Sequence, residues 1–173
     1  MNGWRPMAET DVAAVKAISD AVHGAYTEGV DIYAERLRLY PAGCWVLEQS
    51  GETQGYLISH PWLGDAPPKL DRRLSAIPTA ADRLYLHDLA LLPAARGSGA
   101  AGEAVALVLN IADAAGFERI ALTAVNGADA FWRKQGFNPI TNQSAAYGEG
   151  SLLMERAVQK PRASSRVITN GSL

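Results

Sequence analysis

A glycine-rich turn stands between an apolar segment and the start of a helix pattern near the middle of the chain. The apolar segment ends at Pro93, and residues 96–101 read Arg-Gly-Ser-Gly-Ala-Ala. Glycines let an anion approach the backbone, and the free N–H groups at a helix start attract negative charge. The run lacks the Gly-Lys-Ser/Thr ending of a nucleotide-hydrolysing loop and a complete Gly-x-Gly-x-x-Gly dinucleotide fingerprint. We therefore expect it to bind the phosphates of a cofactor, although such a run can also be a plain turn and Arg96 a solvated surface charge.

Ionisable side chains lie in the apolar segment that leads to this turn, in Tyr85-Leu86-His87-Asp88. The two-residue period of a strand predicts Tyr85 and His87 on one face of a sheet, with Leu86 and Asp88 on the other. A histidine titrates near neutral pH and can take a proton from a substrate directly or through water. The alternative is a core histidine satisfied by structural hydrogen bonds, and we expect a capping or pairing role for Asp88.

Three segments in this order resemble the GCN5-related N-acetyltransferase (GNAT) superfamily over about residues 4–157. They are Leu89-Ala90-Leu91-x-Pro93, the spacing Arg96-x-x-Gly99-x-Ala101, and residues 126–137, NGADAFWRKQGF. The resemblance implies that the backbone of one strand contacts the pantetheine arm and thioester carbonyl of acetyl-CoA, that the turn binds the pyrophosphate, and that a later asparagine hydrogen-bonds the cofactor or a strand edge. The residues implied are Leu89, Ala90, Leu91, Arg96, Gly97, Ser98, Gly99, Ala100, Ala101, Asn126 and Trp132.

The resemblance also implies an acetyl-CoA-dependent enzyme that acetylates a primary amine of a small molecule or peptide. Since no cysteine is well placed as a nucleophile, we expect direct attack by the amine, with His87 and Tyr85 as candidates for taking its proton. Many family members carry a tyrosine acid toward the CoA thiolate where this chain has Trp132, and an indole gives up no proton at neutral pH. Tyr147 is the predicted substitute. The alternative function is a non-catalytic acyl-CoA-binding module.

The amine acceptor is expected to enter beside the first two helices. Residues 22–26 and 60–62 offer imidazole and aromatic groups there. Glu28, Asp31 and Glu35 are available to bind a cation, but an ordinary place in the surface or core is the favoured interpretation for each of these residues. The sequence does not identify the acceptor.

Composition limits the remaining possibilities. With 173 residues, of which 48% are hydrophobic, the chain fits one domain over residues 1–158, followed by a loosely ordered tail at 159–173. A net charge of −2 without a block of Lys or Arg predicts neither nucleic acid nor an anionic membrane as partner. We expect a cytoplasmic protein without a metal, a buried thiol at Cys44, and either a monomer or a homodimer.

Hydrophobic periodicity predicts a mixed α/β fold with a mostly antiparallel sheet flanked by helices. The predicted helices span residues 10–22, 32–39, 99–115 and 128–135. The predicted strands span residues 44–49, 54–60, 84–92, 118–124, 137–141 and 151–156, and the first two form a hairpin across residues 50–52. Four prolines make residues 61–82 a long irregular loop.

Overall fold

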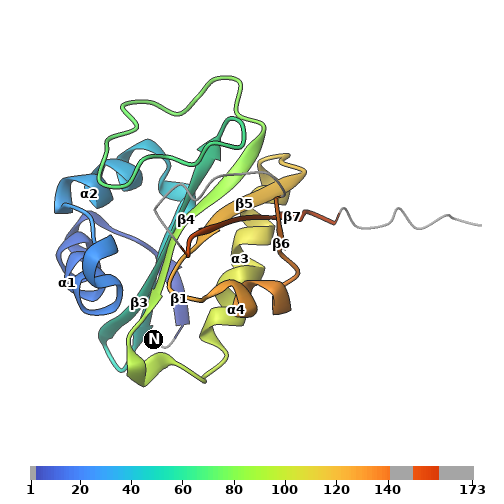
Figure 1. Ribbon diagram of the computed structural model, residues 1–173. Coiled ribbons are helices and arrows are strands. Elements are labelled where there is room, and N and C mark those ends of the chain that lie inside the picture. The colour runs from blue at the N-terminus through green and yellow to red at the C-terminus, as the bar shows by residue number, and fades with distance from the viewer. Residues whose placement is uncertain (1–2, 141–149, 160–173) are drawn as a thin grey trace, which may run out of the picture.

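The computed structural model describes residues 3–140 and 150–159 as one mixed sheet of seven strands with helices on both faces (Figure 1). The helices are α1 (Val12–His23), α2 (Val30–Leu39), α3 (Ala100–Ala114) and α4 (Asp129–Lys134). The strands are β1 (Gly3–Pro6), β2 (Cys44–Gln49), β3 (Glu52–Trp62), β4 (Arg83–Leu91), β5 (Arg119–Ala124), β6 (Asn138–Pro139) and β7 (Leu152–Ala157). The predicted fold class is confirmed, and the predicted element boundaries hold to within a few residues.

The sheet follows the order β1-β2-β3-β4-β5-β7-β6. Among these strands only β4 and β5 pair in parallel, and α3 connects them as a crossover helix. Antiparallel hairpins need only short turns, as at Ser50-Gly51, where φ values of 54° and 81° match the left-handed conformation of a tight hairpin. Sequence analysis missed β1, because a short edge strand containing Gly3 and Pro6 carries no alternating pattern.

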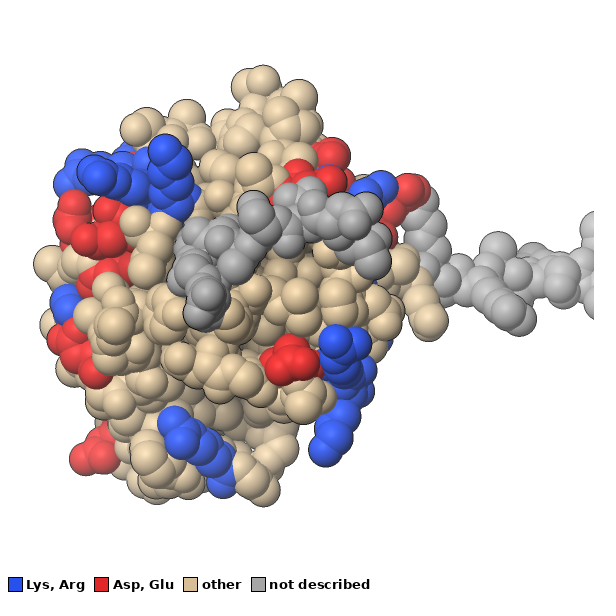
Figure 2. Space-filling model, in the orientation of Figure 1, with Lys and Arg blue, Asp and Glu red and all other residues tan. Residues whose placement is uncertain are grey.

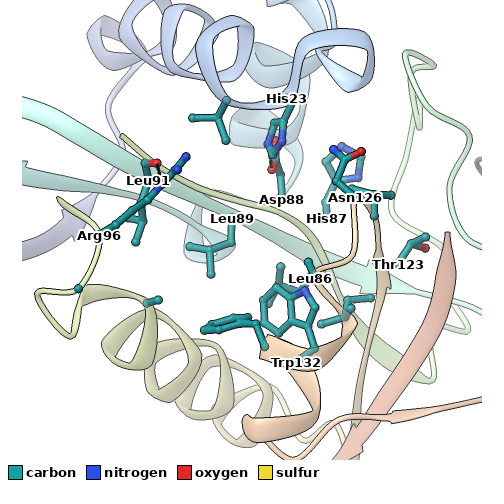
Figure 3. A pocket seen from close by; sticks show the side chains of 17 residues that line it. His23, Leu86, His87, Asp88, Leu89, Leu91, Arg96, Thr123, Asn126 and Trp132 are labelled. Atoms are coloured by element: carbon teal, nitrogen blue, oxygen red, sulfur yellow. Dashed lines mark hydrogen bonds and ion pairs between the residues drawn. The ribbon is translucent and has the colours of Figure 1, made fainter. Parts of the chain in front are cut away.

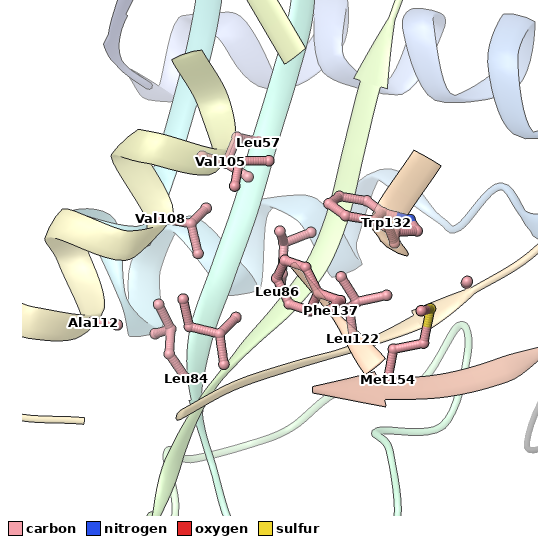
Figure 4. Close-up of a cluster of buried hydrophobic side chains, with 12 residues drawn as sticks. Leu57, Leu84, Leu86, Val105, Val108, Ala112, Leu122, Trp132, Phe137 and Met154 are labelled. Carbon is pink, nitrogen blue, oxygen red and sulfur yellow. The ribbon is translucent and has the colours of Figure 1, made fainter. Parts of the chain in front are cut away.

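Two hydrophobic cores lie on opposite faces of the sheet. The core beneath α3 and α4 contains Leu84, Leu86, Leu122, Trp132 and Phe137 (Figure 4). The core beneath α1 and α2 is built from a second group of side chains, which are Val15, Ile18, Tyr33, Cys44, Val46, Tyr56, Ile58 and Ala90. Cys44 is fully buried as predicted, and burial raises the pKa of its thiol to about 12. The thiol is therefore protonated and unreactive at neutral pH.

Buried carboxylates hold the proline-rich loop that follows β3 against α2. Glu28 accepts a hydrogen bond from the backbone N–H of Asp71 at 2.8 Å, and Glu35 accepts from those of Leu74 and Ser75 at 2.8 and 3.1 Å. Arg36, which is completely buried, donates to Glu35 and to the carbonyl of Arg72. The carboxylates of Glu28 and Glu35 thus fix a loop and are not open to bind a cationic acceptor.

The surface carries charges of both signs. On the face shown in Figure 2, basic and acidic side chains lie in small separate groups among uncharged residues. Within residues 3–140 and 150–159, no helix is long and apolar enough to cross a membrane.

The core beneath α3 predicts a large effect of truncating Leu84, which is fully buried there. Leu84→Ala should lower the free energy of unfolding by about 2 to 5 kcal/mol, because lost burial and a residual cavity both contribute. Leu63→Ala is the matched control, because Leu63 is 49% exposed, and it should change stability by no more than about 0.5 kcal/mol. Urea denaturation followed by circular dichroism measures both, and equal losses would contradict this core assignment.

Candidate functional site

Strands β4 and β5 diverge along their length, and a cavity lies in the opening. Their parallel pairing covers Leu84 with Ile120, Tyr85 with Ala121, and Leu86 with Leu122, and in the described chain it extends no further. The cavity beyond has a volume of about 660 Å³, with walls from β4, β5, α4, the end of α1 and the turn before α3. Backbone groups on the β5 side of β4 therefore face a cavity where an ordinary sheet would supply a strand partner.

A β-bulge in β4 lies at the point where the strands diverge. Opposite β3, Asp88 pairs with Ile58 and Leu86 pairs with Ser59, so His87 is the extra residue. The bulge reverses the alternation of side chains beyond it. The prediction that Asp88 lies on the face opposite His87 is therefore wrong: both point to the α1 and α2 side, where Asp88 contacts His23 and Tyr56. A strict two-residue period cannot anticipate an inserted residue.

The predicted phosphate-binding turn lies at one end of the cavity (Figure 3). Arg96, Gly97 and Ala101 line it, and Arg96 Nε donates to the carbonyl of Leu91 at 3.1 Å. Gly97 and Gly99 have φ values of 77° and 90°, a conformation that side chains disfavour, so both glycines are needed to shape the turn into α3. The first N–H groups of α3 lack intrahelical acceptors and can meet an anion.

The remaining turn residues stabilise the turn from outside the cavity. Ser98 Oγ donates to the carbonyl of Ala95 at 2.7 Å, and the carbonyl of Ala100 accepts from the Trp4 indole at 3.1 Å. Ser98, Gly99 and Ala100 do not line the cavity. Along β4, Leu89 and Leu91 line it, whereas the Ala90 side chain packs in the core under α1 and α2. Only backbone atoms of Ala90 could therefore contact a cofactor.

His87 faces the cavity from the bulge and is paired with a carboxylate. Its Nε2 shares a short hydrogen bond with Glu28 Oε1, and both side chains are only 2% exposed. Nδ1 of His87 is buried and has no hydrogen-bond partner among the described residues. Burial raises the pKa of Glu28, but the charge of His87, its hydrogen bond and the Asp71 N–H outweigh this and lower it overall. Glu28 is thus an anion that orients the His87 ring.

The other candidate groups on this face are less open. The hydroxyl of Tyr85 hydrogen-bonds Thr123 Oγ1 at 2.8 Å, and Thr123 itself lines the cavity. His60 is fully buried with its ring 5.8 Å from that of His87, and burial together with the charge of His87 lowers its pKa to about 3. His60 is therefore a neutral core histidine, and it does not line the cavity.

A second imidazole–carboxylate pair lies across the bulge. His23, the last residue of α1, has its Nε2 2.6 Å from Asp88 Oδ1, and Tyr56 donates its hydroxyl to Asp88 Oδ2. Burial lowers the pKa of His23. The hydrogen bond and charge of Asp88, together with the charge of Glu28, raise this pKa by more than burial lowers it, so the net shift is upward. In Figure 3 His23 points from α1 toward the cavity, directly above Asp88.

Aromatic side chains from α4 form the opposite wall. Trp132 is 8% exposed and packs edge-on against Phe131 and Phe137, with ring centres 4.9 and 5.4 Å away. Asn126 lines the cavity from the segment after β5, with a φ of 54° that asparagine tolerates better than most residues. An apolar slot with a few polar groups suits the pantetheine arm of a coenzyme.

The structure thus gathers most of the residues that the sequence singled out. Tyr147 lies outside the described residues, so its role stays a prediction. Sequence analysis placed His23 beside the acceptor but not with Asp88, and it assigned no role to Thr123, whereas Phe131 lies in the segment 126–137 that it singled out. Asp88 and Tyr85, the partners of His23 and Thr123, are distant in sequence, and no local pattern marks these pairs. In the described chain, no three His, Cys, Asp or Glu side chains gather as a metal site.

Comparison with protein families agrees with this geometry. The model of the acetyltransferase (GNAT) family matches residues 15–137. The chain belongs to that family. No curated protein matches it. The matched region covers the α1 cavity wall, the bulge, the glycine-rich turn before α3 and the α4 aromatics, so the family match coincides with the site.

Solved structures share the fold at low sequence identity. A GNAT-like decarboxylase, GphF, in complex with isobutyryl-CoA has a TM-score of 0.76 at 17% identity, covering 90% of this chain and 99% of its own. Ard1 from Thermoplasma volcanium has a TM-score of 0.71 at 15% identity, with coverage of 92% and 99%. The ribosomal-protein-S18-alanine N-acetyltransferase from Escherichia coli has a TM-score of 0.69 at 17% identity, with coverage of 93% and 96%. Such similarities show the fold and leave the reaction open.

The His23–Asp88 pair predicts a histidine that titrates above its ordinary range. In NMR titrations of the imidazole protons, Asp88→Asn should lower the pKa of His23, since burial remains while the carboxylate charge is lost. Because the folded-state pKa is raised, the pair stabilises the protein below the unfolded pKa, and this contribution disappears as the pH rises through the folded pKa. The stability lost in Asp88→Asn should thus shrink at alkaline pH. An unchanged His23 pKa would contradict the pairing.

Proposed function

We propose that this GNAT protein transfers an acetyl group from acetyl-CoA to a primary amine of a small molecule or peptide. One observation carries the proposal: the phosphate-binding turn, the divergence of β4 and β5, and a carboxylate-paired imidazole border one cavity. A binding module needs the first two of these features. Only catalysis needs a positioned proton acceptor at the place where the strands part.

The residues present fit a CoA thioester as the acyl-donor substrate. The Arg96–Gly97 turn and the start of α3 would take the pyrophosphate, and the apolar slot between Leu89 and Trp132 would take the pantetheine arm. Backbone N–H groups of β4 that lack a β5 partner would hydrogen-bond the thioester carbonyl. Such donors matter most when negative charge develops on that oxygen during attack.

His87 is the proposed proton acceptor for the attacking amine. Its Nε2 is occupied by Glu28, so the proton would be taken at Nδ1, which has no partner among the described residues. The anionic Glu28 would then stabilise the imidazolium that forms. The amine is expected to approach from the side of α1 and α2, where His87 is held.

The phosphate-binding turn generates a binding prediction. Acetyl-CoA at 100 times its dissociation constant should stabilise the protein by about 2.7 kcal/mol, measured as a rise in melting temperature. Gly97→Val should weaken acetyl-CoA binding at least about tenfold, since a branched side chain disfavours φ of 77°. Gly116→Val, with a φ of 79° at the far end of α3, imposes similar strain without touching the site and should leave affinity unchanged. The absence of a rise in melting temperature at millimolar acetyl-CoA would refute acetyl-CoA as the acyl donor.

The His87–Glu28 pair generates a kinetic prediction. His87→Gln should lower turnover with acetyl-CoA and an accepted amine about 10² to 10⁴-fold, the usual contribution of a positioned base, at nearly unchanged acetyl-CoA affinity. Release of free CoA thiol across a panel of amines provides the assay. It also separates an enzyme from the non-catalytic binding module, which would bind acetyl-CoA and release none. Full turnover in His87→Gln would make His87 structural, with Tyr85 the next candidate.

A further inference from the structure

Breaking a thioester produces a thiolate, and a proton must reach its sulfur. The described walls of the cavity contain few groups that ionise, namely His23, His87, Asp88 and Arg96. Other polar groups there, such as the Trp132 indole and the Thr123 hydroxyl, hold their protons too tightly to act as acids at neutral pH. Among the described residues, the candidate proton donors are therefore these four ionisable groups.

Three of the four ionisable groups are unsuited to this task. Arg96 keeps its proton at every accessible pH. Asp88 has both carboxylate oxygens engaged, one with His23 Nε2 and the other with the Tyr56 hydroxyl, so neither is left for a thiolate. His87 is paired with Glu28 and is already assigned to the amine proton. His23 remains, and it lines the cavity with its side chain 16% exposed.

The surroundings of His23 favour a protonated ring. His23 ends α1, where the partial negative charge of the helix C-terminus stabilises a cation. The groups that face it are the anions Asp88 of β4 and Glu28 of the segment before α2, with the Tyr56 hydroxyl behind Asp88. On the same helix, the charge of Lys16 is paired with that of Asp20. Asp88 holds Nε2 of His23, so Nδ1 is the ring nitrogen left to exchange a proton with a ligand in the cavity.

We infer that His23, held by Asp88, protonates the leaving thiolate. This rests on the proposed acetyl transfer. The amine nitrogen forms a bond to the carbonyl carbon and loses a proton to His87. The carbon–sulfur bond breaks, its electron pair stays on sulfur, and the imidazolium of His23 gives its proton to that sulfur. The products are the amide, CoA thiol, neutral His23 and protonated His87, and proton exchange with solvent resets both rings. Asp88 is a positioning residue in this scheme.

The test compares two acyl donors with different leaving groups. CoA leaves as an alkyl thiolate that needs a proton, whereas the nitro-substituted aryl thiolate of 4-nitrophenyl thioacetate is stable without one. His23→Gln should lower kcat/KM about 10²-fold with acetyl-CoA and leave it nearly unchanged with the aryl thioester. Asp88→Asn should show the same selectivity to a smaller degree, and the double variant should lose no more than His23→Gln alone. Asp20→Asn removes an exposed carboxylate of α1 and is the matched control, with no expected change.

A second readout uses acetyl-CoA alone. Wild-type turnover should fall as the pH rises and His23 loses its proton, and His23→Gln should lack this alkaline fall. Circular dichroism and melting temperature establish whether each variant is folded. If His23→Gln is not folded, Asp88→Asn is used in its place for both readouts.

Equal losses of His23→Gln with both donors, or an alkaline fall that persists in the variant, would overturn the assignment. So would donor-selective loss in Tyr147→Phe without any in His23→Gln. Failure of the wild type to acetylate any amine would refute the proposed function instead, which keeps the two results distinguishable.

Discussion

The backbone hydrogen bonding of β4 is the constraint on which the site depends. One edge of β4 is paired with β3 along nearly its whole length, while the other edge is paired with β5 only from Leu84 to Leu86. Buried backbone groups must find partners, so an open strand edge beside a cavity is costly unless water or a ligand satisfies it. The unpaired edge of β4 is therefore available to an extended polar ligand.

The β4 bulge converts this opening into a site with acid–base groups. By inserting His87, it turns two consecutive ionisable side chains toward α1 and α2, where His87 meets Glu28 and Asp88 meets His23. The partner of His87, Glu28, also fixes the loop after β3 through the N–H of Asp71. The position of the proposed base is therefore tied to a loop that has no regular secondary structure, and changes in this loop can alter catalysis without touching the cavity.

The sequence predicted the features that local rules control. Apolar periodicity located the helices and every strand except β1, and Arg96, Gly97, Ala101, Asn126 and Trp132, which the motifs singled out, lie in the cavity walls, whereas Ser98, Gly99 and Ala100 do not. The pairing of His23 with Asp88 and of His87 with Glu28 could not be predicted, because these partners are 65 and 59 residues apart and one inserted residue decides their side of the sheet. The hydrogen bonds of Glu28 and Glu35 to the loop backbone could not be predicted either, because a bond to a backbone N–H does not depend on the type of residue that donates it.

A crystal structure with an uncleavable acetyl-CoA analogue, in which a methylene group separates the sulfur from the carbonyl, tests whether the open edge of β4 binds the acyl donor. We expect the pantetheine arm of the analogue to lie between β4 and β5 and its pyrophosphate to lie on the turn before α3. The carbonyl should accept a hydrogen bond from the β4 backbone, between the rings of His23 and His87. A pantetheine arm bound elsewhere, or a carbonyl out of reach of the bulge, would contradict binding of the acyl donor at the β4 edge.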